Sequence, residues 1–152
     1  MEKWNPENVE KIWQRVQSSH TPPALQPDLC GMVARERNAA AIYSILARKF
    51  PGSTGKQLLF FARQSQSHAA SIKGICALTG QSCPPEPPVS KPSAPIHILL
   101  RRCYGLAAQA LAEYEALTAR ADIGNIFHQL ARDEQSQMVF LLQLLGTTKP
   151  HR

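Results

Sequence analysis

The sequence predicts an all-α protein, a four-helix bundle built from two helical hairpins. The first indication is the distribution of its twelve prolines, six of which fall between Pro84 and Pro95. Because proline disrupts the interior of a helix, long helices are confined to the proline-free stretches 28–50, 52–83 and 96–149. The second indication is local composition: Ala, Leu, Gln, Arg and Ser dominate these stretches, and the alternating pattern of a strand is missing.

Four long helices are expected in these stretches, preceded by a short extra helix near 6–19. Asp28 can cap the first long helix, because its side chain can accept a hydrogen bond from a free backbone N–H of the first turn. Ser53 or Thr54 can cap the second long helix in the same way. The predicted long helices span 28–49, 53–79, 96–120 and 123–145.

Glycines mark the ends of these helices. Gly80 and Gly146 stand where C-terminal glycines belong. The last proline-free stretch is too long for one globular helix, and Asp122-Ile123-Gly124-Asn125 is the natural place to divide it. The proline-rich segment 81–95 then crosses from one hairpin to the other. The chain is expected to comprise an N-terminal helix with a proline-rich lead-in, a bundle and a tail, over 1–27, 28–146 and 147–152.

Composition limits the class of protein. With 152 residues, of which 43% are apolar and 18% charged, the chain can bury the core of one domain. No window of about 20 apolar residues is present, and the first residues lack the apolar run of a signal peptide, so we expect a cytoplasmic protein with no membrane partner. No Cys-x-x-Cys motif occurs, and free thiols are expected at Cys30, Cys76, Cys83 and Cys103.

The two hairpins resemble each other in sequence. The segment ARQSQSH, which begins at Ala62, aligns with ARDEQSQ 69 residues later. The helices that precede these segments align at an offset of 71, which places Tyr43 on Tyr114 and Glu36 on Ala107. Because the two matches fall on neighbouring helices in the same order, they indicate a duplicated hairpin.

Polar side chains interrupt the apolar stripes near the middle of the helices. In an antiparallel bundle these mid-helix positions meet at one height, so they should form one buried polar layer. A buried carboxylate is costly unless it is neutralised or paired, so the layer must bind a metal, form a hydrogen-bonded ion network or share protons. The predicted members of this layer are Glu36, Tyr43, Ser65, His68, Tyr114, Glu134 and Gln137.

These residues resemble those of the ferritin-like superfamily, in particular its rubrerythrin-like branch. In that family a glutamate on the first helix and a Glu-x-x-His motif on the second are repeated on the third and fourth, and the six residues hold two irons. Glu36, with Tyr43 seven residues later, is similar to the first helix of the family, and Tyr114 is similar to the tyrosine of the third. The sequences LARKFPG and CALTG also resemble the family's first hairpin. The resemblance covers residues 28–146 and implies a ferritin-like four-helix bundle.

Half of the family's ligands are replaced in this chain. The motif of the second helix reads Ser65-Gln66-Ser67-His68, the third helix carries Ala107, and the motif of the fourth reads Glu134-Gln135-Ser136-Gln137. Serine and alanine do not hold a pair of irons, and the amide of glutamine is a weak ligand. The resemblance therefore implies a degenerate di-iron site in which Glu36, His68 and Glu134 remain around one metal position.

Two interpretations of this remnant stay open. In the one we favour, no cofactor is bound, Glu36 is protonated or paired with His68, and the chain is a non-catalytic binding or scaffold protein. In the alternative, Glu36, His68 and Glu134 hold a single Fe, Mn or Zn ion. We expect no di-iron catalysis, and an enzyme built on this site would be a metal-dependent oxidoreductase. In the network interpretation, Glu134 would hydrogen-bond Tyr43, Ser65 or Gln137.

Two kinds of partner remain to be considered. A homodimer is expected, with pairing through the helices at 28–49 and 53–79. Between Asp28 and Glu86, the same two helices carry seven basic residues against a single acidic one, Glu36, which is typical of a face that binds nucleic acid or an acidic partner. We do not favour nucleic acid, because no aromatic side chains alternate with the charges to stack on bases. The basic residues are Arg35, Arg37, Arg48, Lys49, Lys56, Arg63 and Lys73.

Overall fold

The computed structural model describes residues 27–148, and the predicted helix near 6–19 lies outside this range. All regular structure in the described part is helical, which confirms the all-α prediction. The four helices are α2 (Leu29–Lys49), α3 (Gly52–Leu78), α4 (Ile96–Leu117) and α5 (Gly124–Thr147).

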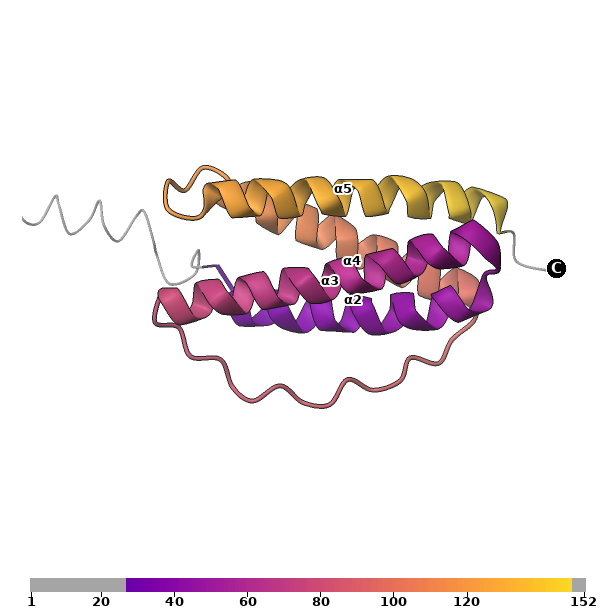
Figure 1. The fold of residues 1–152 in the computed structure, drawn as a ribbon, viewed down its shortest axis with the longest axis horizontal. Coiled ribbons are helices and arrows are strands. Elements are labelled where there is room, and N and C mark those ends of the chain that lie inside the picture. Colours follow the sequence, from indigo (N-terminus) through magenta and orange to yellow (C-terminus); the bar gives the residue numbers. More distant parts are fainter. Residues whose placement is uncertain (1–26, 149–152) are drawn as a thin grey trace, which may run out of the picture.

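The four helices form two antiparallel hairpins that lie side by side (Figure 1). Helices α2 and α3 make the first hairpin, and α4 and α5 make the second. The segment between α3 and α4 runs along the outside of the bundle for its whole length, so that α4 starts at the opposite end from the point where α3 stops. This is the bundle with one long crossover that the distribution of prolines predicts.

The first two helix boundaries show which capping predictions hold. Oδ1 of Asp28 accepts a hydrogen bond of 2.9 Å from the backbone N–H of Gly31, so the predicted cap of α2 is confirmed. The predicted caps of α3, Ser53 and Thr54, are wrong. That helix begins at Gly52, which has a φ of 67°, and no side chain caps it.

Of the other predicted helix ends, the one at Gly80 is confirmed and two others are wrong. Gly80 has a φ of 73°, and the hydrogen bonds after α3 follow the Schellman pattern, with N–H groups of Gly80 and Gln81 donating to the carbonyls of Ala77 and Cys76. The predicted stop at Gly146 is wrong, because α5 continues to Thr147. Helix α4 ends at Leu117, three residues earlier than the predicted end at 120, where hydrogen bonds of the i to i−3 type replace the helical ones.

The core consists of two apolar clusters with the predicted polar layer between them. Met32 and Phe127 belong to the cluster near the start of α2, and Leu46 and Leu141 belong to the cluster near its end. All seven predicted layer residues are at most 3% exposed, so their inward orientation is confirmed. The apolar clusters on both sides keep water away from the layer, so its charges must be balanced within it.

The prediction of four free thiols is wrong for two of the cysteines. Cys30 and Cys83 are 53 residues apart in sequence but form a disulfide with a Cα–Cα distance of 5.5 Å. The turn at Gly80 sends the chain back toward the start of α2, and this reversal places Cys83 beside Cys30. Cys76 and Cys103 are free and buried, as their helical positions predicted.

Candidate metal centre

Three ionisable side chains from three helices meet in the polar layer. They are Glu36 of α2, His68 of α3 and Glu134 of α5, and each is at most 3% exposed. Nδ1 of His68 lies 3.4 Å from Oε1 of Glu36 and 3.2 Å from Oε1 of Glu134. The three residues predicted as the remnant of a metal site are thus brought together around one point.

A fourth residue, Asp133, fixes the histidine ring from the other side. Oδ2 of Asp133 lies 2.9 Å from Nε2 of His68, so this nitrogen carries a hydrogen and donates it to the carboxylate. The sequence prediction missed Asp133. It precedes Glu134 and is only partly buried, and nothing in the helical periodicity marks it as a partner of the histidine.

A separate hydrogen-bonded group lies in the same polar layer. The hydroxyl of Tyr43 donates to Oε1 of Gln137 at 2.8 Å, and Nε2 of Gln137 donates to Oε1 of Gln64 at 2.9 Å. Both ends of the Gln137 amide are therefore engaged by protein. The partners expected for Glu134, namely Tyr43, Ser65 and Gln137, are wrong, because Glu134 bonds His68 instead.

The replaced ligand positions face inward but carry no suitable donor. Ser65 and Ala107 are both buried. The hydroxyl oxygen of Ser65 has no hydrogen-bond partner among the described residues, so it takes no part in the network. A second ion would have only Glu134 as a charged ligand, and this arrangement does not fit a di-iron centre.

The charges within the layer balance through shifts in pKa. Burial lowers the pKa of His68, but hydrogen bonds to Glu134, Glu36 and Asp133, together with the charge of Glu36, raise it to about 10. Burial, together with a hydrogen bond to Glu36, raises the pKa of Glu134 to about 9. Burial opposes ionisation of Glu36 as well, but hydrogen bonds from Glu134, His68 and Tyr114 outweigh it and lower its pKa. At neutral pH the site therefore holds an imidazolium, one carboxylate and one neutral carboxyl.

The same geometry also fits a single metal ion. One nitrogen of His68 and one oxygen from each of Glu36 and Glu134 lie within 4.8 Å of one another. Oε2 of Glu36 is buried and has no hydrogen-bond partner in the described part of the chain, so a second oxygen is left available to an ion. Two carboxylates and one imidazole suit Fe, Mn or Zn, and the ion would replace the protons that Nδ1 and Glu134 now hold.

The basic surface of α2 and α3 is partly neutralised by acidic residues from elsewhere. Arg35 forms an ion pair with Glu113 of α4, and Glu86 of the crossover pairs with both Arg37 and Lys73. These pairs engage three of the seven basic side chains on this face, and their two carboxylates offset two of the seven positive charges.

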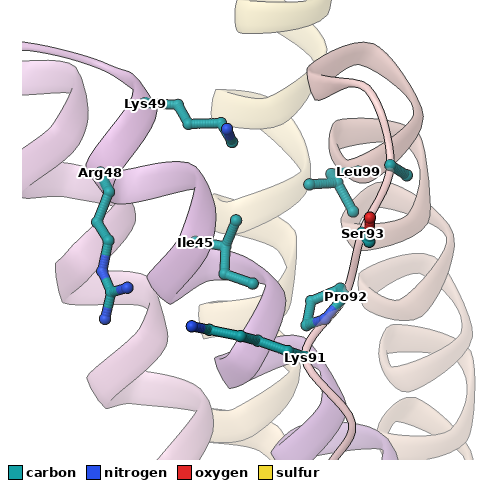
Figure 2. A pocket seen from close by; sticks show the side chains of 8 residues that line it. Ile45, Arg48, Lys49, Lys91, Pro92, Ser93 and Leu99 are labelled. Carbon is teal, nitrogen blue, oxygen red and sulfur yellow. The ribbon is translucent and has the colours of Figure 1, made fainter.

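One group of basic residues lines a surface hollow of about 400 Å³ (Figure 2). Arg48 and Lys49, from the last turn of α2, lie on one side of the hollow, and Lys91 of the crossover lies on another. Ile45 and Leu99 contribute apolar surface. No aromatic side chain lines this hollow, so it offers nothing on which a base would stack.

No helix within residues 27–148 has the length and apolar character needed to cross a membrane. No protein-family model, curated protein or solved structure matches this chain. The residues of the site themselves must therefore carry the functional argument.

Proposed function

We propose that this chain is a metal-binding protein in which Glu36, His68 and Glu134 hold one divalent ion at the centre of a ferritin-like bundle. The orientation of His68 carries the proposal. Its Nδ1 faces two carboxylate oxygens, while its Nε2 is fixed by Asp133. A metal-binding histidine commonly donates its second ring N–H to a carboxylate in this way, which sets the tautomer and orients the ring.

The ion we propose is Fe, Mn or Zn, and its role is structural or sequestering rather than catalytic. Such an ion would supply Lewis acidity or, for iron and manganese, electron transfer. All three ligands are buried, however, and apolar clusters lie on both sides of the polar layer. The resemblance to rubrerythrin-like proteins supports a metal in this layer, and the amide pairs of Gln137 argue for one ion rather than two.

Elemental analysis of protein purified without an affinity tag and reconstituted with each metal tests this function. The wild type should bind about one ion per chain, as expected for three ligands around one position. His68→Ala should bind none, because Nδ1 is the only nitrogen ligand. His128→Ala is the matched control, since His128 is exposed on the surface of α5 and should leave the metal content unchanged. No metal in the wild type, or equal metal in both variants, would overturn the proposal.

A second candidate function is a non-catalytic scaffold that pairs as a homodimer. The layer supports it, because imidazolium, carboxylate and neutral carboxyl already balance one another without an ion. Exposed apolar side chains supply the pairing surface. Among the described residues the exposed large apolar side chains avoid α2, so the pairing we propose uses α3 and α5 in place of the two helices expected from the sequence.

The surface proposed for pairing lies where α3 and α5 meet. The rings of Phe61 and Phe140 pack edge to face across this contact, with centroids 5.4 Å apart. The neighbouring Phe60 and Val139 are each 54% exposed. Exposed large apolar side chains of this kind are available for protein–protein contacts.

Light scattering at several protein concentrations tests the homodimer. Phe60→Glu should shift the mass toward that of a monomer, because it places a charge in the apolar contact. Leu78→Glu is the control: Leu78 is 89% exposed at the far end of α3 and should leave the mass unchanged. A wild type that stays monomeric at all concentrations would exclude this candidate.

A further inference from the structure

A second cluster of metal-ligating side chains lies at one end of the bundle. Cys30 is in the first turn of α2, Cys76 is near the end of α3, and Cys83 is at the start of the crossover. Their three sulfur atoms lie within 4.8 Å of one another. Cys30 and Cys83 form the disulfide, and Sγ of Cys76 lies 3.8 Å from Sγ of Cys83.

Local structure fixes the backbone at Cys30 and Cys76, and it directs the chain toward Cys83, independently of the disulfide. The cap formed by Asp28 fixes the first turn of α2, which carries Cys30. The hydrogen bond of 2.9 Å from the N–H of Gln81 to the carbonyl of Cys76 closes the turn that leads to Cys83. Breaking the disulfide would therefore leave three thiols facing one point.

We propose that the reduced protein binds one monovalent copper ion through the sulfurs of Cys30, Cys76 and Cys83. Thiolate is a soft ligand that favours Cu(I) and Zn(II). A structural zinc site normally has four ligands, whereas the described residues supply three sulfurs here and no neighbouring histidine or carboxylate completes the set. Three thiolates with no further donor suit Cu(I) better than zinc.

The disulfide makes this site dependent on redox conditions. A dithiol reductant supplies two electrons and two protons to the Cys30–Cys83 bond, giving two thiols while the reductant becomes a disulfide. The copper ion then replaces the thiol protons as the three Cu–S bonds form. In the oxidised protein two of the three ligands are joined to each other, so the site is closed.

This site is separate from the centre formed by Glu36, His68 and Glu134. Along α2, Cys30 precedes Glu36 by six residues, a rise of about 9 Å, and along α3, Cys76 follows His68 by eight residues, a rise of about 12 Å. The two sets of ligands also differ in chemistry, because sulfur selects soft ions and oxygen selects harder ones. Failure of one of the two proposed metal sites would therefore not imply failure of the other.

A competition titration tests the proposal. The protein is reduced with a phosphine, desalted without oxygen and titrated with Cu(I) in the presence of a coloured Cu(I) chelator. The reduced wild type should remove one equivalent of copper from the chelator, and the disulfide form should remove none. Cys76→Ser should weaken binding at least tenfold while leaving the disulfide intact.

Three controls make the result specific. Cys103→Ser removes the other free buried cysteine, on α4, and should bind copper as the wild type does. His128→Ala should also bind normally, because this exposed histidine of α5 lies outside the cysteine cluster. Circular dichroism checks that each variant is folded, and Cys30→Ser repeats the test if Cys76→Ser is not. The proposal is overturned if the reduced wild type binds no copper, if a folded Cys76→Ser or Cys30→Ser binds as tightly as the wild type, or if Cys103→Ser loses as much.

Discussion

The hydroxyl of Tyr114 donates a hydrogen bond of 2.7 Å to Oε1 of Glu36 and so joins α4 to the charged carboxylate of α2. Tyr43, with which Tyr114 aligns in the sequence, donates at 2.8 Å to the neutral amide oxygen of Gln137. Two tyrosines at equivalent places in the two hairpins therefore serve different acceptors. The sequence alignment places Ala107 of the second hairpin opposite Glu36 of the first, so α4 offers Tyr43 no carboxylate at the corresponding position.

We predict that Tyr114→Phe destabilises the protein more than Tyr43→Phe does. A hydrogen bond to a charged group contributes about 1.5–3 kcal/mol to stability, against about 0.5–1.5 kcal/mol for a neutral pair. Both tyrosines are at most 1% exposed and both changes remove only a hydroxyl, so each variant controls for the other. Urea unfolding measures the free energies, and equal losses would contradict the assignment of charge to Glu36.

A second prediction compares His68→Ala with Glu134→Gln. His68→Ala leaves the Glu36 carboxylate buried without its cation, a change that typically costs about 3–5 kcal/mol. Glu134→Gln should cost only about 1 kcal/mol, because Glu134 is neutral at pH 7 and a glutamine side chain keeps a hydrogen donor for Glu36.

Thermal and urea unfolding at pH 7 compare the two variants in metal-free protein. The loss in His68→Ala should shrink at acidic pH, where Glu36 can take up a proton and no longer needs a cation. A larger loss in Glu134→Gln than in His68→Ala would show that Glu134, rather than Glu36, carries the negative charge.

Helical periodicity explains why so much of the fold and polar layer was predictable. Glu36 and Tyr43, or Ser65 and His68, are spaced so that each pair lies on one face, and antiparallel packing brings the faces to one height. What remained hidden depends on contacts between segments far apart in sequence. Asp133 and Gln64 reach the layer from its edge, where periodicity gives no signal.

The disulfide and two of the helix ends were not predicted, each for its own reason. Pairing of Cys30 with Cys83 depends on the path of the chain after Gly80, and spacing along the sequence cannot give that path. Gly146 is tolerated inside α5 because a glycine only weakens a helix and does not end it. At the start of α3, Gly52 adopts a positive φ, and the helix starts there without the help of Ser53 or Thr54.

The pKa shifts predict how stability changes with pH. The pKa of His68 rises from its ordinary 6.5 to about 10 on folding, and that of Glu134 rises from 4.5 to about 9. Both groups hold a proton more tightly in the folded state, so the stability they contribute is present at low pH and is lost as pH rises through these windows. Glu36 acts in the opposite direction, since its lowered pKa causes stability to fall in acid.

Metal-free protein should therefore be most stable near pH 5 and should lose roughly 2–3 kcal/mol per pH unit between pH 7 and 9, because two groups take part and each contributes about 1.4 kcal/mol per unit. Urea unfolding across this range measures the slope. Glu134→Gln removes one of the two titrating groups and should flatten the curve. A stability that rises between pH 7 and 9 would contradict the charge state assigned to the layer.

Binding of a divalent ion at this centre should release protons, and the number released reports which groups hold them. Near pH 7.5 the ion must displace one proton from Nδ1 of His68 and one from Glu134, because both pKa values lie above this pH. The proton on Nε2 stays, since it is donated to Asp133.

Calorimetric titration with Zn(II) in buffers of different ionisation enthalpy should therefore give about two protons per ion. Glu134→Gln should bind more weakly and release one proton fewer, because its amide has no acidic proton to lose. Binding without proton release in the wild type would mean that the ion binds elsewhere on the molecule. Asp133→Asn weakens the support of the histidine ring without removing a ligand. In that case this variant would leave the affinity unchanged.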